Sequence, residues 1–550
     1  MTSRFLVLFD ADNIAGFVFD TGRLKEIRGG SALVRDATSP LRIAELVDLV
    51  DDADKRIVYA GGGAGLVRFS TKAAAEAFAH NLRNTYRRST VDGSISVAVT
   101  ETADDDFVAA VDAAHVALRR LKSAQPQVDR QPLAGTHSAI CVSCGRRPVQ
   151  TIYTTPADPL CGVCWTRRNA DDNTHQHMQI GHTGANIRRT TLVDMQNTGD
   201  DLARAFLAAA LEPSWAAAWL PDTMDELGNI SRPRNYVGFL HADGNRMGEH
   251  LRSFLHSLKG KPWIEAEDAY GAFSTAIAQA TQQAVVQALH HVMAPPAKVK
   301  GAFVPFDPIL SAGDDLVLLL AAHHALDVAA RFCTVFESEM SAAATQLGYT
   351  GKMTTAVGVV LAHAKHPILQ LQRQAKDLLR SAKARVADLR RRGKDVSAVD
   401  FEVVTTAVVR PLTEHRRHAY QLEDHNQGLC HLTRRPYTAD DLSRLLDLGR
   451  QLKHGRPTDP TADPDSERRS YPRSQLHGLY SAIFQGYDQA KLQGARAVLR
   501  VNSAQRSLLL TFAGAFDAKD DFPWSSGDTS LDDEITTPIT DLVEIFDFLH

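Results

Sequence analysis

The chain has 550 residues, of which 44% are hydrophobic and 23% charged, and its formal net charge is −4. This composition is ordinary for a globular protein, and the length predicts about three to four domains. The charge excludes binding to nucleic acid through an overall basic surface, so any such contact has to come from local patches. The apolar run Phe5–Phe9 is too short for a signal peptide, and no segment is long enough for a membrane helix. We therefore expect a cytoplasmic protein without membrane contact.

The N-terminal part mixes strands and helices. RFLVLFDAD (4–12) predicts a buried strand, and RIVYAGGGAGLVRFS (56–70) predicts two strands around a glycine turn. TKAAAEAFAHNLRNTYRR (71–88) predicts an amphipathic helix. Residues 123–140 contain several Gln, Pro and Ser residues and predict a linker.

Four of the six cysteines form two CxxC pairs, CVSC (141–144) and CGVC (161–164). Each pair can present two thiolates, and four thiolates complete a tetrahedral zinc shell without a free position. We therefore predict a structural zinc site; a redox CxxC is the weaker alternative. So few cysteines favour a reduced, cytosolic chain over a disulfide framework. The predicted zinc ligands are Cys141, Cys144, Cys161 and Cys164. Cys333 and Cys430 are predicted to be core residues.

A second mixed unit begins at NYVGFLHADGNRMGEHL (235–251) and extends to about residue 412. DPILSAGDDLVLLL (307–320) predicts strands at 308–311 and 316–320 around a turn that carries Asp314 and Asp315. A hairpin tip that points two Asp residues at water would have the same pattern. If the strands are neighbours, however, Asp243 and Asp314 converge, and two magnesium ions about 3.5–4 Å apart could lie between them. Because successive strand residues face opposite sides, we favour Asp314 as the direct ligand, with Asp315 supporting it.

Phosphate contacts are predicted on both sides of these carboxylates. The strand-to-helix turn at Gly244 exposes backbone N–H groups at a helix N-terminus, which is a site for anions. In the later helix ILQLQRQAKDLLRSAKARVADLRRRGK (368–394), Lys376 and Lys383 share a face that could present Lys383 to phosphates. The arginines 390–392 are interpreted as solvated or as contacts to an RNA backbone.

The C-terminal part is predicted to be helical. TADDLSRLLDLGRQLK (438–453) and SQLHGLYSAIFQGYDQAKLQGARAVL (474–499) have helical patterns. Between them, residues 454–474 are rich in Pro and Asp and predict an exposed loop.

The two mixed units resemble each other, which indicates an internal repeat. LFDADNIAG (8–16) matches LHADGNRMG (240–248) with Asp10 on Asp243. AGGGAGLVRF (60–69) matches SAGDDLVLLL (311–320) if Gly63 is set on Gly313. Ala64 and Gly65 then replace the two aspartates, which predicts one working site and one degenerate copy.

An ordered set of motifs resembles the large, polymerase-like subunit of type III CRISPR effector complexes. The motifs span most of the chain and are FDTGRLKEIRGGSALV, YAGGGAGLVRF, CVSCGRRPV…CGVCW, HADGNRMG, SAGDDLVLLL, TTAVGVVLAHAKHPILQLQRQAKDLLRSAK and TRRPYTADDLSRLLDLGRQLK. The resemblance implies an α+β protein with two ferredoxin-like palm domains of the GGDEF and adenylyl-cyclase type, a zinc module and a helical C-terminal domain. The expected boundaries are 1–135 (first, degenerate palm), 136–170 (zinc module), 171–234 (connecting segment), 235–412 (second, catalytic palm) and 413–550 (helical domain).

The resemblance also assigns the site. Asp243 is the first-strand metal ligand, and the family GGDD motif is Ala312 to Asp315, with Asp314 and Asp315 as its acidic pair. Ala312 replaces the first Gly, and a turn position of positive φ would tolerate Ala poorly. Asn245 replaces an Asp that is frequent in the family. The expected cofactors are structural zinc and magnesium or manganese, with ATP as substrate. The residues expected to bind the nucleotide are Gly244, Asn245, Arg246, Met247, Gly313 and Lys383.

The function implied by the resemblance is the synthesis of cyclic oligoadenylate messengers from ATP when target RNA is bound, in antiviral defence. Its partners would be other type III effector subunits, guide RNA and target RNA. No His-Asp dipeptide occurs, so we expect no HD nuclease domain and no cleavage of single-stranded DNA. Two alternatives stay open: a catalytically impaired scaffold subunit, and a free-standing palm-domain cyclase.

Overall fold

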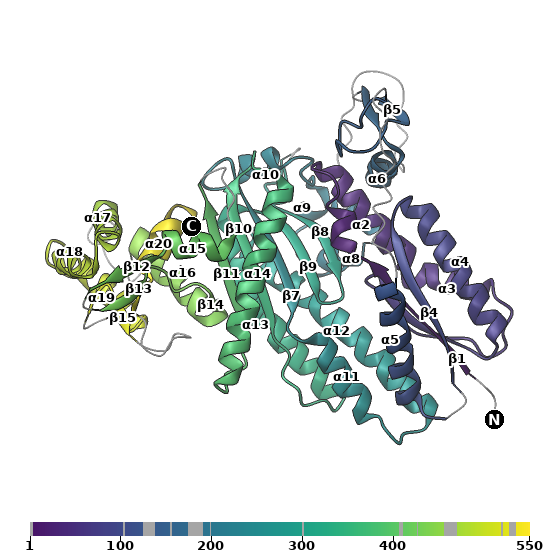
Figure 1. Cartoon of the computed structure of the whole chain (residues 1–550). Helices are drawn as coiled ribbons and strands as arrows, with labels where there is room; N and C mark the ends of the chain where they lie inside the picture. The colour runs from purple at the N-terminus through teal and green to yellow at the C-terminus, as the bar shows by residue number, and fades with distance from the viewer. Residues whose placement is uncertain are drawn as a thin grey trace.

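The structure is a computed structural model that describes residues 4–102, 105–124, 138–154, 157–173, 191–197, 200–299, 302–405, 411–425, 427–455, 470–518, 521–526 and 535–550. Two units lie side by side, each a β-sheet covered by helices, and a small module containing β5 and α6 projects beside the first unit (Figure 1). The C-terminal segment forms the end of the molecule farthest from the first unit. Among the described helices, none combines the length and apolar character needed to cross a bilayer.

The first unit is an antiparallel sheet in the order β2-β3-β1-β4. The apolar run Phe5–Phe9 forms the middle of β1 and is buried, because helices pack on the sheet. The predicted strand, glycine hairpin and helix of this unit are confirmed. Its elements are β1 (Arg4–Asp12), α1 (Ile14–Val18), α2 (Leu24–Thr38), α3 (Pro40–Asp48), β2 (Arg56–Gly61), β3 (Ala64–Phe69), α4 (Lys72–Thr90), β4 (Ser94–Thr102) and α5 (Phe107–Ala124).

The second unit is a six-stranded sheet in the order β14-β11-β10-β7-β9-β8, in which only the β10–β11 pair is parallel. The predicted strands at 308–311 and 316–320 lie within β8 and β9, so the hairpin is confirmed. The elements are β7 (Tyr236–Gly244), α11 (Met247–Ser257), α12 (Trp263–Val292), β8 (Phe306–Ala312), β9 (Asp315–Ala321), α13 (Ala322–Gln346), β10 (Thr355–His363), α14 (Ile368–Arg391) and β11 (Ala398–Val404).

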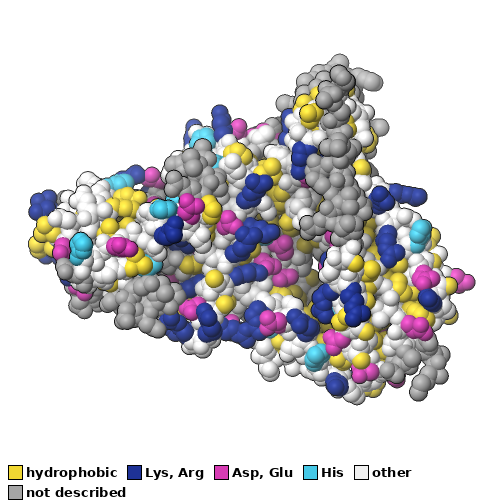
Figure 2. All heavy atoms as spheres, viewed as in Figure 1, with side chains coloured by type: hydrophobic (Ala, Val, Ile, Leu, Met, Phe, Trp, Pro, Cys, Tyr) yellow, Lys and Arg dark blue, Asp and Glu magenta, His cyan; other side chains and the backbone are white. Residues whose placement is uncertain are grey.

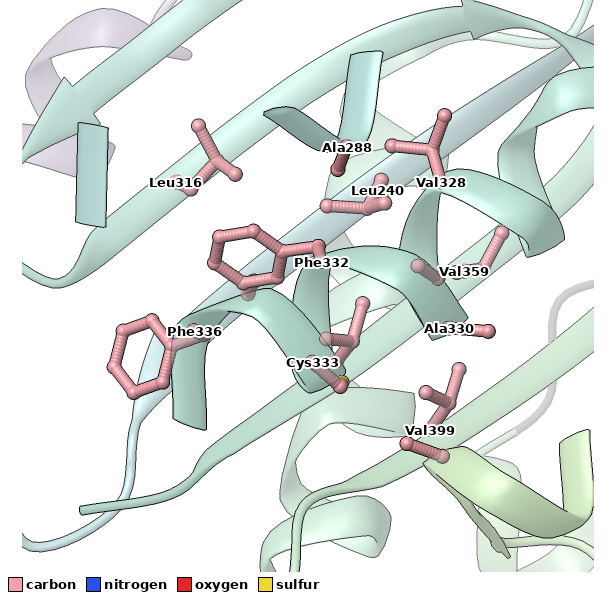
Figure 3. Close-up of a cluster of buried hydrophobic side chains, with 14 of the residues drawn as sticks. Leu240, Ala288, Leu316, Val328, Ala330, Phe332, Cys333, Phe336, Val359 and Val399 are labelled. Carbon is pink, nitrogen blue, oxygen red and sulfur yellow. The ribbon is translucent and has the colours of Figure 1, made fainter. Parts of the chain in front are cut away.

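Helices cover both faces of the second sheet, which explains why Leu316–Leu320 is a continuous apolar run and not an alternating one. Figure 3 shows one face, where Leu240 and Leu316 of the sheet lie near Phe332 of α13. Cys333 is fully buried in the same cluster, as predicted for a core residue. On the other face, Phe239 and the strands beside it pack against α14.

The two units repeat one order of elements: a central strand, helices, a hairpin, a helix, a strand and a further helix. The last helix of each order carries a lysine that pairs with the aspartate of the central strand. In the first unit Lys122 of α5 pairs with Asp10, and in the second Lys383 of α14 pairs with Asp243. The structural repeat therefore extends to the polar groups at the strand ends.

The strand register corrects the alignment of the two glycine turns. Gly61 pairs with Ala64 in the first hairpin, as Ala312 pairs with Asp315 in the second. Gly62, with φ 61°, therefore corresponds to Gly313, with φ 63°. The alignment of Gly63 with Gly313 was therefore wrong by one residue, because a run of three glycines permits more than one alignment of so short a motif. Gly63 and Ala64 are the counterparts of Asp314 and Asp315.

The two units are packed together at their glycine turns. A Cβ on Gly62 would lie 3.0 Å from the backbone N of Gly313, so the hairpin tips touch. A Cβ on Gly271 of α12 would lie 2.4 Å from the carbonyl oxygen of Val58, which only a glycine permits. Beside this contact, Arg68 Nε donates to the buried Glu267 carboxylate at 2.9 Å.

Arg28 of α2 joins three parts of the chain. Its guanidinium donates to Asp307 of β8 at 2.9 Å and to Asp171 of α6 at 3.0 Å, and it lies 3.4 Å from Asp222. The Arg28 side chain is only 5% exposed, and that of Asp307 is fully buried. Burial raises the pKa of Asp307 to about 6, and the adjacent Arg28 opposes that rise. Removing the Arg28 guanidinium would therefore leave the negative charges of these carboxylates without a positive partner.

The module that carries the four cysteines is held against α2. A Cβ on Gly29 would lie 1.7 Å from the carbonyl oxygen of Arg167, so α2 and α6 are in backbone contact. Most of the predicted linker, 125–137, lies outside the described residues. The elements here and in the predicted connecting segment are β5 (Thr151–Thr154), β6 (Ala157–Leu160), α6 (Gly162–Asn173), α7 (Leu192–Asn197), α8 (Asp201–Ala209), α9 (Ser214–Ala217) and α10 (Met224–Ile230).

The C-terminal part contains the helix predicted at 438–453, and the segment 474–499 forms two helices with a break before Tyr487. It also contains a small sheet, β12-β13-β16-β15, that we did not predict. Its strands have two to four residues, which is too short for an alternating pattern to be recognised. Of the predicted loop, 456–469 lies outside the described residues. The elements are α15 (Leu412–Ala419), β12 (Gln421–Asp424), β13 (Gly428–His431), β14 (Tyr437–Thr438), α16 (Ala439–His454), α17 (Arg473–Ile483), α18 (Tyr487–Leu499), α19 (Ser503–Ala515), β15 (Ser525–Ser526), β16 (Ile535–Thr536), α20 (Ile539–Ile545) and a 3-10 turn, η1 (Phe546–Phe548).

Replacing Arg28 with Ala should lower the free energy of unfolding by about 3–5 kcal/mol, because buried carboxylates lose their cation. Denaturant unfolding measures this. The matched control is Arg42→Ala, whose pair with Glu45 is exposed and which should cost at most about 1 kcal/mol. Equal effects of the two substitutions would contradict the role given to Arg28.

Candidate functional site

The candidate site lies where β7 and the β8–β9 hairpin end together. In the antiparallel register Ala242 pairs with Leu316, so one further step sets Asp243 opposite Asp315. Side chains directly opposite each other in neighbouring strands share a face of the sheet. Asp315 is therefore the carboxylate that shares a face with Asp243, although we favoured Asp314 for that position; the convergence of Asp243 with Asp314 stays a prediction.

Asp315 is held by a histidine that the sequence analysis missed. His241 Nε2 lies 2.9 Å from Asp315 Oδ1, and the His241 side chain is only 8% exposed. His241 precedes Asp243 by two residues, so both point to the same face of β7. The alternation in FLHADG carried this signal, because a polar residue two positions before a site aspartate lies on the same side of the strand.

Asp314 occupies the tip of the hairpin, against the backbone of β7. A Cβ on Gly244 would lie 2.7 Å from Asp314 Oδ2, so only a glycine leaves room for this carboxylate. Burial is the main cause that raises the pKa of Asp314 to about 6, and the charge of Asp315 adds to it. Backbone N–H groups of Gly244 and of Asp314 itself hydrogen-bond to the carboxylate and oppose the rise.

Lys383 is at the site, as predicted. It forms an ion pair with Asp243, and both side chains are partly exposed, 38% for Lys383 and 28% for Asp243. A cation is therefore already in contact with the carboxylate cluster. Carboxylate oxygens are the ligands that magnesium prefers. Among the described residues, however, only the four cysteines bring three or more possible ligand atoms within 4.8 Å of one another, so the aspartates do not form a closed metal site in this structure.

Fewer backbone N–H groups than predicted are available to bind phosphates near Gly244. The N–H of Gly244 is used by Asp314, and the N–H of Asn245 donates to the Thr354 carbonyl at 2.8 Å. The Asn245 side chain is buried and donates to Thr354 Oγ1, so it turns away from the carboxylates. Arg246 is the N-cap of α11, which begins at Met247. The first N–H groups of a helix have no acceptor within it, and these remain for an anion.

The replacement of the first motif glycine by Ala312 is compatible with the turn. Gly313 has the positive φ, 63°, whereas Ala312 ends β8 in a pair with Asp315. The strain of the left-handed conformation therefore falls on the glycine that is kept. The poor tolerance of Ala that we expected at a turn position of positive φ therefore does not apply to Ala312.

The four cysteines of the two CxxC pairs converge. Their sulfur atoms all lie within 4.8 Å of one another, and Cys144 Sγ is 3.9 Å from Cys161 Sγ. Ligands of a tetrahedral Zn–S₄ site with bonds of about 2.3 Å are about 3.8 Å apart. The Cys164 N–H points at Cys161 Sγ over 3.4 Å, and Gly145 has φ 65°, so tight turns present both pairs. The donor set therefore fits zinc, as predicted.

Comparison with known proteins identifies the part of the chain that holds the carboxylates. Residues 236–392 match the family model described as Cas10/Cmr2, second palm domain. This segment is similar to the second palm domain of the Cas10/Cmr2 family. The family that the ordered motifs indicate is thereby confirmed for this part of the chain, which contains Asp243, the hairpin aspartates and Lys383. Among curated proteins, none matches this chain.

Solved structures extend the likeness to the whole fold. Csm1 of T. onnurineus is 14% identical with a TM-score of 0.51, and the match covers 100% of this chain and 70% of that one. A Csm1-Csm4 cassette in complex with AMPPNP is 13% identical with a TM-score of 0.50, covering 100% and 70%. The same cassette in complex with pppApApA is 14% identical with a TM-score of 0.50, covering 100% and 69%. At these identities the likeness shows a shared, mixed α+β fold of the Csm1 type.

The raised pKa of Asp314 predicts a pH dependence of stability. The pKa is about 6 in the folded chain and about 3.9 in an unfolded one. The stabilising effect of the bound proton is therefore complete below pH ~4 and is lost as the pH rises through about 6. With a chelator present, Asp314→Asn should gain about 1–2 kcal/mol over the wild type between pH 4 and 7. Thermal unfolding of both proteins across this range measures the effect. A stability difference that does not change with pH would contradict the raised pKa of Asp314, whose side chain is half-buried.

Removal of one thiolate should abolish zinc binding. Cys164→Ser should lose the bound metal, because a four-thiolate shell has no spare ligand. Metal analysis of the purified chain should show one zinc per wild-type chain and none in the variant. Cys333→Ser is the control, because Cys333 is buried in a different core, and it should keep the zinc.

Proposed function

We propose that the chain is the large subunit of a type III CRISPR effector complex, and that its second palm condenses ATP into cyclic oligoadenylates when target RNA is bound. The proposal rests on one observation. Asp243, Asp314 and Asp315 lie at the same end of neighbouring strands, beside Lys383, in the segment that matches the second palm family. The Csm1 relatives with AMPPNP and pppApApA support a nucleotide as substrate.

The proposed organisation follows the predicted boundaries with two exceptions. The helix α6 (Gly162–Asn173) crosses the boundary at 170, and β14 (Tyr437–Thr438) pairs with β11 and so belongs to the sheet of the second unit. Residues 1–135 form a first, degenerate palm, 136–170 a zinc module and 171–234 a connecting segment. Residues 235–412 form the catalytic palm and 413–550 the C-terminal domain. Gly63 and Ala64 stand where the second palm has its aspartates, which supports a single catalytic centre.

In the proposed mechanism, a ribose hydroxyl oxygen attacks the α-phosphorus of ATP in line. A phosphodiester bond forms, the bond to the β-phosphate oxygen breaks, and pyrophosphate leaves. Asp243, Asp314 and Asp315 would hold magnesium or manganese ions, which would supply positive charge to the reacting phosphate. Most of the rate enhancement comes from positioning and charge neutralisation.

The other residues at the site have supporting roles. Lys383 neutralises phosphate charge next to Asp243, and the backbone amides of Arg246 and Met247, at the N-terminus of α11, bind the phosphates. His241 orients Asp315 through its 2.9 Å contact. Gly244 leaves space for the Asp314 carboxylate, and Gly313 adopts the positive φ that the hairpin turn requires.

The proposed partners are a Csm4-like subunit and other effector subunits, guide RNA and target RNA, in the cytoplasm. The two cassette relatives contain Csm4. Zinc has a structural role in this proposal, because the four thiolates complete its coordination.

The test combines activity with a matched control. Asp243→Asn and the double variant Asp314→Ala/Asp315→Ala should each lower product formation by at least about 10²-fold, because charge stabilisation at the reacting phosphate is lost. The control is Asp10→Asn, the counterpart in the first unit, which should keep the activity. The assay is mass spectrometry of products after incubation of the assembled complex with ATP, Mg²⁺ or Mn²⁺ and target RNA. Unchanged synthesis in the site variants would refute the assignment, and an inactive wild type would favour a scaffold subunit.

A further inference from the structure

We infer that the outer face of α14 binds the phosphodiester backbone of the growing linear oligonucleotide product, an inference that rests on the proposed function. The face is formed by Arg373, Lys376 and Arg380, which we term the basic stripe; all three are exposed. The stripe leads along the helix to Lys383, which contacts Asp243. A positively charged surface thus begins at the candidate site and continues away from it.

The helix geometry aligns these four side chains. The positions 373, 376, 380 and 383 are three or four residues apart, so they fall within about 80° of the helix circumference. The opposite side carries Leu371, Ala375 and Leu378, which are buried against the sheet. The stripe is therefore fixed to the rigid core of the second unit and cannot turn away from the site.

The positive charge of the stripe is only partly compensated. Arg380 pairs with Asp377 on the flank of the helix away from Lys383. Among the described residues, no carboxylate lies within ion-pair distance of Arg373 or Lys376. Figure 2 shows Lys and Arg side chains gathered in the middle of this face, where Figure 1 places α14.

The stripe suits a single strand better than a protein partner. Protein interfaces have an apolar or aromatic centre, and α14 exposes none of its large apolar side chains. Consecutive basic residues are about 4.5–6 Å apart along the helix axis. They can therefore follow consecutive phosphates of an extended strand, as basic grooves do in other proteins that bind single strands.

The stripe has a defined role in chain growth. Each addition forms one phosphodiester bond at a ribose hydroxyl and releases one pyrophosphate, while the hydroxyl proton leaves to solvent. The oligonucleotide must then stay bound for the next addition or for ring closure. Phosphates that lie on Arg373, Lys376 and Arg380 would hold it, with the chain end left near Lys383. The stripe would thus control product length and leave the first condensation unaffected.

The first measurement is of binding. The triple variant Arg373→Gln/Lys376→Gln/Arg380→Gln is compared with Lys72→Gln/Arg87→Gln/Arg88→Gln, which removes the same charges from exposed positions of α4. Fluorescence anisotropy of a labelled linear hexa-adenylate with the full chain should show about tenfold weaker binding for the stripe variant. The slope of log affinity against log salt should fall by about 2, as for three lost contacts to a single strand. The control should bind as the wild type does, and equal binding by all three proteins would overturn the inference.

The second measurement is of product length, with ATP, metal and target RNA supplied to the assembled complex. The stripe variant should form the first phosphodiester bond at the wild-type rate but release more linear dimer and less cyclic product. An active wild type and a stripe variant with the same product lengths would overturn the inference and leave the proposed function intact. An inactive wild type would count against the proposed function, and the binding comparison would still decide whether the stripe holds a strand.

Discussion

The antiparallel register between β7 and β9 is the constraint on which the candidate site depends. It sets Asp243 opposite Asp315 and brings the hairpin tip with Asp314 against Gly244. Carboxylates gathered at one end of a sheet repel each other, so this arrangement needs groups that compensate their negative charge. Lys383, His241 and the N–H of Gly244 provide them in this chain. A shift of the register by one residue would reverse the faces of the strand and separate these groups.

The surrounding fold holds that register. The central strand β7 lies between β9 and β10, with α12 and α13 on one face and α14 on the other. Because α14 packs on the sheet through its apolar side, Lys383 and the basic stripe have set positions relative to Asp243. The same packing thus positions the catalytic candidates and the surface proposed to receive the product.

The first unit has the same order of elements as the second but lacks the two hairpin aspartates. Asp10 and Lys122 reproduce the pair of Asp243 and Lys383, but Gly63 and Ala64 take the places of the hairpin aspartates. The glycines retained in both turns have a packing reason, because the hairpin tips touch at Gly62 and Gly313. Buried ion pairs around Arg28 connect the first unit, the cysteine module and the second unit.

Local patterns in the sequence were sufficient for several features. Continuous apolar runs predicted β1 and the β8–β9 hairpin, and the CxxC spacing predicted the convergence of four thiols, because these features depend on neighbours in the chain. Helical periodicity placed Lys383 on a face that reaches the site. Only the tertiary structure decided what depends on pairing between distant strands: that Asp315 shares a face with Asp243, that His241 holds it, and that Asn245 turns away. Register and burial arise from contacts between remote segments, and no local pattern contains them.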